Sequence, residues 1–265
     1  MTILPFRYAA NCSLLFTELP LLERPAAARE AGFAGIEFWW PWPDQPVPAD
    51  STVDGFVAAV RDGGIPLIGL NFYAGDLAGP DCGVLSLPDR SSEFRDNIPV
   101  LTGIGRALGV PGHNALYGNR IDGVPPEQQD ELATENLVLA AEALAGPHAT
   151  LLVEPVSGPK PYPLRTADDV IAVLDRIGAD NTGFLCDLFH LANTGDDIDA
   201  ALTRHAARIA HVQIADHPGR GEPGSGALDL DHYLSVIAAS GYSGFVTAEY
   251  HPTTTTSASL AWLNR

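Results

Sequence analysis

Four oxygen-bearing side chains follow short apolar runs, at the points where strands of a parallel sheet are expected to end. They are Glu154, Asp187, Gln213 and Glu249. Carboxylates that lie close together raise one another's pKa, and a bound divalent cation removes this electrostatic cost. Carboxylate and amide oxygens form a hard donor set that suits Mg²⁺ or Mn²⁺, whereas zinc favours the Cys and His ligands that this set lacks. The pattern therefore predicts a magnesium or manganese site.

An acidic residue at the end of a single strand has a simpler explanation, because such a residue often caps the next helix. The repetition over four consecutive strands favours a shared site instead. Side chains alternate along a strand, so Thr247 and Glu249 should lie on one face of the sheet. By the same alternation His211 lies one layer below Gln213, where we expect it to fill a polar niche.

Other polar residues at the expected strand ends are candidates for binding a substrate. His190 lies at the start of the sixth loop and could donate a hydrogen bond to a substrate oxygen; the alternative is a loop histidine without a role. Asn71 and Asn114 end the third and fourth strands and are candidates to line the pocket. Glu37 has a similar place on the second strand, before the aromatic run 38–40, whose rings could wall the pocket or simply pack.

The elements that must position these side chains alternate regularly along the chain. Strands are predicted near residues 7–13, 35–39, 66–72, 112–116, 150–155, 183–187, 209–214 and 245–249. Helices are predicted near residues 20–31, 52–62, 92–108, 127–146, 167–177, 197–206 and 231–240, with a short one near 257–263. Strict alternation over 265 residues predicts one α/β domain, residues 1–265, folded as a single (β/α)8 TIM barrel. A doubly wound sheet is the alternative.

The composition limits the partners and the compartment. The chain has 33 acidic and 15 basic residues and a net charge of −18, which argues against nucleic acid and anionic membranes as partners. Three cysteines without a Cys-x-x-Cys pair are typical of a reduced, cytoplasmic protein, and no apolar stretch predicts a membrane span or signal. Lys160 is the only lysine, and its Pro-rich surroundings disfavour Schiff-base chemistry. The sequence leaves a homo-oligomer open.

One glycine-rich segment matches a well-known motif in the wrong context. Residues Gly219–Gly224 fit the dinucleotide pattern G-x-G-x-x-G and follow a predicted strand. The next helix, however, is expected near Asp231, and only one further strand remains to build a nucleotide-binding half. A nicotinamide dehydrogenase is therefore a poor interpretation.

Several sequence blocks together resemble the hydroxypyruvate isomerase family of xylose isomerase-like barrels. The blocks cover nearly the whole chain in family order: 71–76, 93–95, 106–109, 151–155, 186–190, 211–216, 220–226 and 248–250. The resemblance implies a metal ion held by Glu154, Asp187, Gln213 and Glu249. It also implies that Glu154 and Glu249 are the catalytic residues that carry the proton transfers.

The resemblance also suggests a reaction and a small-molecule substrate. It implies isomerisation of a small hydroxy-oxo acid, with hydroxypyruvate to tartronate semialdehyde through an enediolate as the first choice. The alternatives are a 2-oxo-tetronate isomerase and a ketose 3-epimerase, and Gln213 favours the isomerase branch because related epimerases usually have a His there. Residues Tyr73 and Ser157 and the Trp-rich segment 39–43 depart from the family pattern near the expected mouth and leave the exact substrate open.

An anionic substrate in so acidic a chain needs a local cation. Arg220 lies in the glycine-rich loop after Gln213, and its planar guanidinium could bind a substrate carboxylate through two hydrogen bonds. The alternative is a surface ion pair of Arg220 with Glu222 or Asp216. Two other functions on the same fold are disfavoured: an endonuclease for damaged DNA would need a cationic face, and an inactive sugar-acid binding protein would not need both glutamates.

Overall fold

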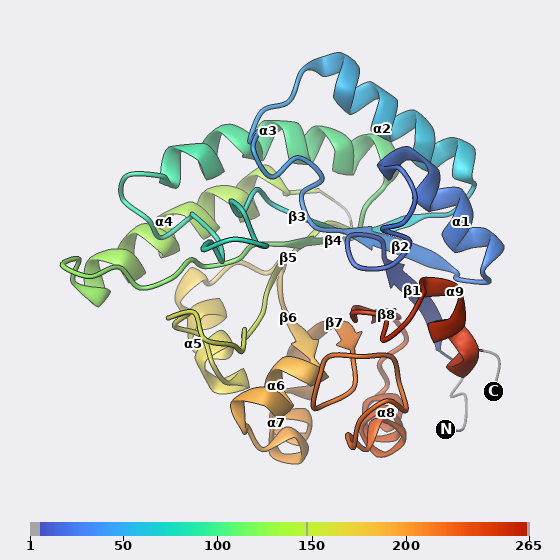
Figure 1. Ribbon diagram of the computed structural model, residues 1–265. Coiled ribbons are helices and arrows are strands. Elements are labelled where there is room, and N and C mark those ends of the chain that lie inside the picture. The colour runs from blue at the N-terminus through green and yellow to red at the C-terminus, as the bar shows by residue number, and fades with distance from the viewer. Residues whose placement is uncertain (1–5, 147, 264–265) are drawn as a thin grey trace.

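The computed structural model describes residues 6–146 and 148–263 and shows eight parallel strands closed into a barrel (Figure 1). Each strand pairs with its neighbours in the sequence, and the last strand pairs with the first to close the sheet. The (β/α)8 barrel predicted from the sequence is therefore confirmed. The strands are β1 (Arg7–Asn11), β2 (Gly35–Phe38), β3 (Leu67–Asn71), β4 (Gly112–Asn114), β5 (Thr150–Val153), β6 (Thr182–Asp187), β7 (Ile209–Ile214) and β8 (Phe245–Ala248).

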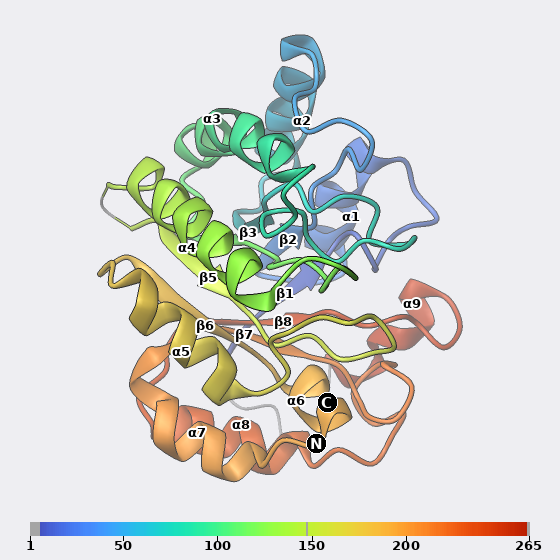
Figure 2. The ribbon, with the colours of Figure 1, turned by 90° about the vertical axis from the view of Figure 1, so that its left-hand side faces the viewer.

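Helices follow the strands in the chain and surround the barrel (Figure 2). Neighbouring helices such as α3 and α4, or α7 and α8, lie side by side in both views. No helix within the described ranges is long and apolar enough to cross a membrane. The helices are α1 (Arg24–Glu30), α2 (Asp50–Gly63), α3 (Ser91–Leu108), α4 (Pro126–Ala143), α5 (Ala167–Ile177), α6 (Leu188–Thr194), α7 (Ile198–His205), α8 (Leu230–Ala239) and α9 (Thr256–Ser259).

Local signals explain why α5 begins and ends as the sequence predicts. The Thr166 side chain accepts a hydrogen bond from the backbone N–H of Asp169, and the Asp169 carboxylate accepts from the backbone N–H of Thr166. This capping box satisfies two donors that a helix start otherwise leaves unpaired. At the other end Gly178 has a φ of 65°, a left-handed conformation that glycine adopts at little cost.

Helix α6 is the one element that the sequence analysis misses, since it assigns these residues to a loop. The Asp187 carboxylate accepts a hydrogen bond from the backbone N–H of His190 at 3.0 Å and so caps the helix. Seven residues span only two turns, too few for a clear helical period in the sequence. His190 consequently lies inside a helix rather than at the start of a loop, which corrects the prediction.

Several strands end one or two residues before their predicted limits, and this placement matters for the site. β4 ends at Asn114 and β5 at Val153, whereas the apolar pattern suggested ends at 116 and 155. Glu154 and Glu249 are thus the first residues after β5 and β8. Both lie at the carboxyl ends of their strands, the end at which barrels of this kind carry their active sites.

Candidate active site

A cavity of about 150 Å³ opens at the carboxyl ends of the strands. It is smaller than the roughly 300–1,000 Å³ of pockets for drug-sized ligands, which suits a substrate of a few heavy atoms. Its lining mixes apolar loop residues with side chains that can donate or accept protons and hydrogen bonds. The chemically capable residues of the lining are Trp39, Asn71, Glu154, Lys160, His190, Arg220 and Glu249.

Two buried carboxylates and an imidazole form the closest cluster at this cavity. Glu154, Asp187 and His190 each place a ligand atom within 4.8 Å of the others. Burial raises the pKa of Glu154 to about 8, and the neighbouring charge of Asp187 adds to the shift. Burial also raises the pKa of Asp187, to about 6, although the Arg220 guanidinium opposes the shift. The cluster therefore concentrates negative charge that a cation would stabilise.

Arg220 supplies part of that positive charge. One of its terminal nitrogens lies 2.6 Å from a Glu249 oxygen and 3.9 Å from an Asp187 oxygen. Burial raises the pKa of Glu249 well above its ordinary value, and the guanidinium counteracts the rise. Arg220 thus bridges Asp187 at the end of β6 and Glu249 after β8.

Neither of the surface ion pairs considered as alternatives for Arg220 forms. Glu222 instead accepts hydrogen bonds from the backbone and side chain of Thr253. Asp216 accepts from three backbone N–H groups of its own loop, which folds the glycine-rich segment around a carboxylate. The next helix, α8, begins at Leu230. The segment therefore does not open a helix as a dinucleotide-binding motif would.

Gln213 is held by a fourth carboxylate, that of Glu37. The Gln213 amide nitrogen donates to Glu37 at 2.6 Å, and His211 lies 2.8 Å from the other Glu37 oxygen. Burial alone would raise the pKa of Glu37, but its hydrogen-bond donors outweigh that effect and lower the pKa. The Gln213 oxygen is buried and has no hydrogen-bond partner among the described residues. Its amide is therefore oriented with the oxygen free to bind a ligand.

Asn11 links this network to Glu249. Its amide nitrogen lies 3.0 Å from an oxygen of Glu37 and 3.0 Å from an oxygen of Glu249. His211 also lies 3.2 Å from the Thr247 hydroxyl, which confirms that it fills a polar niche one layer below Gln213. Three of the four predicted ligands thus take part in two contact groups: Asp187 and Glu249 around Arg220, and Gln213 around Glu37. Glu154, the fourth, lies beside Asp187 and His190.

The surroundings of His190 decide which of its nitrogens faces the acids. The backbone N–H of Ser157 donates to His190 Nδ1 at 3.1 Å, so this nitrogen is an acceptor. Burial lowers the pKa of His190 well below its ordinary value, so the ring is neutral. In the neutral ring the proton then sits on Nε2. This nitrogen lies 3.7 Å from Asp187 and is a hydrogen-bond donor rather than a metal ligand.

The remaining candidates for substrate binding take different positions. Asn71 lines the cavity, as does Trp39, whose indole N–H lies 3.3 Å from Glu249. Asn114 does not line the cavity, and its amide nitrogen donates a hydrogen bond to the Glu154 carboxylate at 2.6 Å. The structure therefore places Asn114 as a support for Glu154, not as a direct substrate contact. Of the aromatic run, Trp39 walls the pocket, while Trp40 packs against Trp42.

The donor set fits a divalent cation. Glu154 and Asp187 place oxygens within 4.8 Å of each other, and buried Glu249 lines the same cavity as Glu154. The buried Gln213 oxygen, which has no hydrogen-bond partner among the described residues, is a neutral oxygen of the kind that hard cations accept. The Arg220 guanidinium already contacts two of the acids, as a compensating positive charge would. This buried cluster can hold a metal ion.

Comparisons with known proteins match the whole barrel. The sequence model of the xylose isomerase-like TIM barrel family matches residues 25–265. A putative hydroxypyruvate isomerase of Streptomyces coelicolor is 52% identical, over 97% of this chain and 95% of its own. The chain belongs to the hydroxypyruvate isomerase family of xylose isomerase-like TIM barrels. The resemblance seen in the sequence blocks is thereby confirmed.

Other members of the wider group carry different names. A 2-oxo-tetronate isomerase of Cupriavidus necator is 34% identical, over 97% of each chain. A crystal structure named as an AP endonuclease, family 2, from Brucella melitensis is 31% identical, with a TM-score of 0.88 and 98% of each chain covered. The family and fold are therefore shown, whereas the substrate has to be argued from the site.

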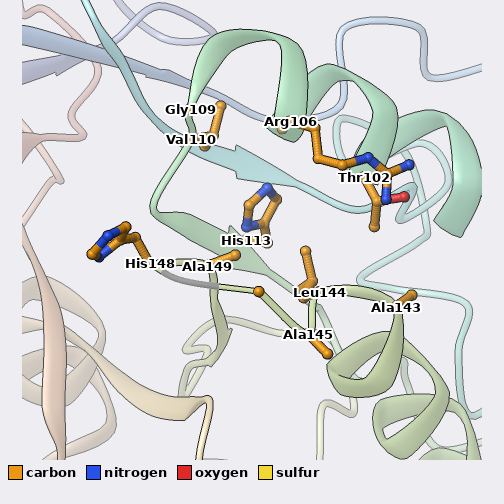
Figure 3. A pocket seen from close by; sticks show the side chains of 12 residues that line it. Thr102, Arg106, Gly109, Val110, His113, Ala143, Leu144, Ala145, His148 and Ala149 are labelled. Carbon is orange, nitrogen blue, oxygen red and sulfur yellow. The ribbon is translucent and has the colours of Figure 1, made fainter.

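A second cavity, of about 360 Å³, lies near the amino ends of β4 and β5, where Val110 and Ala149 line it (Figure 3). The carboxyl-terminal ends of α3 and α4 border it, and the ring of His113 from β4 projects into it. Burial lowers the pKa of His113 to about 4, so the imidazole is neutral. Among the described residues, no carboxylate belongs to the lining of this cavity. We therefore place the chemistry of this hydroxypyruvate isomerase family member at the acidic end.

Three contributors to the acidic site escaped the sequence analysis as functional residues. Asn11 and Ser157 carry no charge and act only through contacts with residues of neighbouring strands and loops. Lys160 was considered only for Schiff-base chemistry, yet it lines the cavity. Its position in the loop after β5 was the available signal, because these loops form the mouth of a barrel.

The raised pKa values predict how the metal-free protein responds to pH. A group whose pKa rises on folding stabilises the fold at low pH and loses this contribution as pH approaches its folded value. For Glu154, raised from 4.5 to about 8, the loss should occur between these values, and metal affinity should increase over the same range. Calorimetric titration with Mn²⁺ and denaturant unfolding at several pH values measure both effects.

The Glu154→Gln variant is the control for this prediction, because it keeps the side-chain shape and removes the titration. Its metal-free form should lose less stability between pH 5 and 8 than the wild type, a window set by the shifted pKa. Identical pH profiles for the two proteins would contradict the assignment to Glu154.

Proposed function

We propose that the protein is a divalent-metal-dependent isomerase that converts hydroxypyruvate to tartronate semialdehyde. The observation that carries the proposal is the pair of buried glutamates, Glu154 and Glu249, which line one small cavity with raised pKa values. The 52% identity to a putative hydroxypyruvate isomerase over nearly the whole chain supports the substrate class.

The reaction needs a group that removes a proton beside a carbonyl and a group that returns one to the former carbonyl carbon. A carboxyl group serves either step best when its pKa lies near the working pH, as burial arranges for Glu154. Glu249 is the second group, and it lines the same cavity. The two glutamates exchange the acid and base roles when the reaction runs in the reverse direction.

A bound Mg²⁺ or Mn²⁺ would supply Lewis acidity that stabilises the negative charge of the enediolate. Glu154, Asp187, Gln213 and Glu249 would hold it. Glu37 and Asn11 orient two of these ligands from behind, through hydrogen bonds to Gln213 and Glu249. His190 donates its Nε2–H to a substrate oxygen.

Arg220 contributes a second donor to the substrate. Its Nε is buried and lacks a hydrogen-bond partner in the described part of the chain, although one terminal nitrogen is occupied by Glu249. An N–H donor therefore remains for a substrate oxygen. Asn71 lines the wall and provides a neutral polar contact.

The proposal is tested by proton exchange. Purified protein with Mn²⁺ and hydroxypyruvate in D₂O should give tartronate semialdehyde and place deuterium on carbon, both visible by nuclear magnetic resonance. A panel with a 2-oxo-tetronate and with ketohexoses distinguishes the related isomerase and epimerase activities. If the protein epimerises a ketohexose at carbon 3 faster than it converts hydroxypyruvate, the proposed isomerase function is replaced by an epimerase function.

A metal-dependent endonuclease is the competing function, because one similar structure carries that name. The net charge of −18 disfavours binding of a polyanion, and the cavity of about 150 Å³ disfavours a nucleotide chain. We also propose a reduced, cytosolic setting, in keeping with the three buried free cysteines. Cleavage of an abasic-site duplex by the metal-loaded protein would support the endonuclease instead.

A further inference from the structure

The only lysine of the chain lies at the cavity with an uncompensated charge. Lys160 Nζ donates to the backbone carbonyls of Leu77 at 3.1 Å and Asp81 at 2.5 Å. Both acceptors are neutral, and an ammonium group has three N–H donors. Within residues 6–146 and 148–263 no carboxylate forms an ion pair with Lys160, so its charge and one donor remain for a ligand.

The carboxylate of Asp81, whose backbone carbonyl contacts Lys160, is already paired with another cation. Both Asp81 oxygens lie 2.9 Å from a terminal nitrogen of Arg90. One of them also accepts the backbone N–H of Asp76 at 2.9 Å. The Asp81 carboxylate is thus turned to Arg90 while its backbone carbonyl holds Lys160, and the local geometry leaves the ammonium without a negative partner.

The other cation of the lining is differently placed. Arg220 lies against Glu249 and Asp187, so these two carboxylates balance its charge. Lys160 comes from the loop after β5 and bridges to the loop after β3, where Leu77 and Cys82 also line the cavity. The cavity therefore has balanced charges at its acidic end and a free positive charge on the loops that cover it.

We propose that Lys160 is a specificity-determining residue that binds the carboxylate of the substrate. The inference rests on the proposed isomerase function and names the part of the substrate that Lys160 reads. A hydroxy-oxo acid has two reacting oxygens at one end and a carboxylate at the other. With the reacting oxygens at Glu154 and Glu249, the carboxylate lies toward the loops and pairs with the ammonium. A neutral ketose gains nothing from this charge.

Matched substrates and variants test the role. Hydroxypyruvate and dihydroxyacetone differ only in a carboxylate against a hydroxymethyl group. Lys160→Met should raise the KM for hydroxypyruvate about tenfold, the lower end of the effect expected for one charged hydrogen bond. The KM for dihydroxyacetone should stay unchanged. Lys160→Arg should restore most of the preference for hydroxypyruvate over dihydroxyacetone. Arg61→Met, on α2 and bonded to a backbone carbonyl of Ala107, removes an equal charge far from the cavity and should leave the preference unchanged.

Equal losses for both substrates in Lys160→Met would overturn the proposal, because they would show that Lys160 only holds the two loops together. Chemical labelling gives a readout that needs no turnover. As the only lysine, Lys160 is the single side-chain target of an amine-acetylating reagent. Hydroxypyruvate should slow acetylation of the Lys160 peptide, measured by mass spectrometry, and dihydroxyacetone should not.

The labelling result separates this inference from the proposed function. If the wild type turns over neither compound, the isomerase proposal fails, and protection by hydroxypyruvate alone still supports an anion-binding Lys160. If hydroxypyruvate is turned over but gives no protection at saturating concentration, the isomerase stands and the role of Lys160 is overturned.

Discussion

Glu154→Gln and Glu249→Gln should each lower kcat by at least about a hundredfold, the usual scale for loss of a general acid or base. Glutamine keeps the size and one oxygen of each side chain but cannot accept and return a proton at neutral pH. Glu249 contacts Arg220, Glu154 lies beside Asp187, and both glutamates line one cavity. Steady-state isomerase assays with saturating Mn²⁺ measure the effect.

The control for these variants is Glu222, an acid of the loop after β7 that does not line the cavity. Glu222 bonds to Thr253 at the surface, so Glu222→Gln should keep near wild-type kcat. Metal affinity must be measured alongside, because both catalytic glutamates are also proposed ligands. A variant that binds Mn²⁺ normally and retains turnover would remove that glutamate from the proton transfers.

The barrel was predictable because its signals are local and repeated. Each strand is a short apolar run, and helices such as α5 carry their own caps, at Thr166 and Gly178. Helix α6 was missed because its seven residues are too few to show a helical period, and because its capping residue Asp187 was interpreted as an acid of the site. Of the two explanations weighed for an acid at a strand end, the helix cap is observed at this position, and the role as a site residue stays a prediction.

The candidate site was predictable only in the acids and the amide that end strands. Four acids and amides at strand ends could be read from the sequence, since a barrel brings those ends together. The support of Gln213 by Glu37 could not, because it depends on which residues of β2 and β7 meet across the barrel. Room for this contact comes from Gly69 of β3, where a Cβ would lie 3.0 Å from the Glu37 side chain. Such fits arise from three-dimensional packing.

The partners of Arg220 show the same limit. The sequence placed it near the site, but the choice among a substrate carboxylate, Glu222 and Asp216 missed the contact that forms, with Glu249. A loop of several glycines can adopt many shapes. Its path here is set by Asp216, which binds three backbone N–H groups of the loop, and by pairing of the Arg220 carbonyl with His251.

Glu37→Gln should weaken metal binding about ten- to a hundredfold, the usual effect of losing a residue that orients a metal ligand. Glu37 accepts hydrogen bonds from Gln213, His211 and Asn11, and a glutamine has only one oxygen for these donors. The Gln213 amide would then lose the orientation that leaves its oxygen free, and Asn11 would hold Glu249 less firmly. Calorimetric titration of the metal-free protein with Mn²⁺ measures the affinity.

Thr247→Val is the matched control, because it removes a hydrogen bond from the far side of the same network. The Thr247 hydroxyl contacts His211, while no hydrogen bond joins it to Gln213 or Asn11 in the described structure. If Glu37 acts by orienting the ligands, Thr247→Val should bind Mn²⁺ nearly as the wild type does, although both variants lose some thermal stability. An equal loss of affinity in the two variants would mean that the network only stabilises the fold. Unchanged affinity in Glu37→Gln would mean that Gln213 needs no support to face the metal.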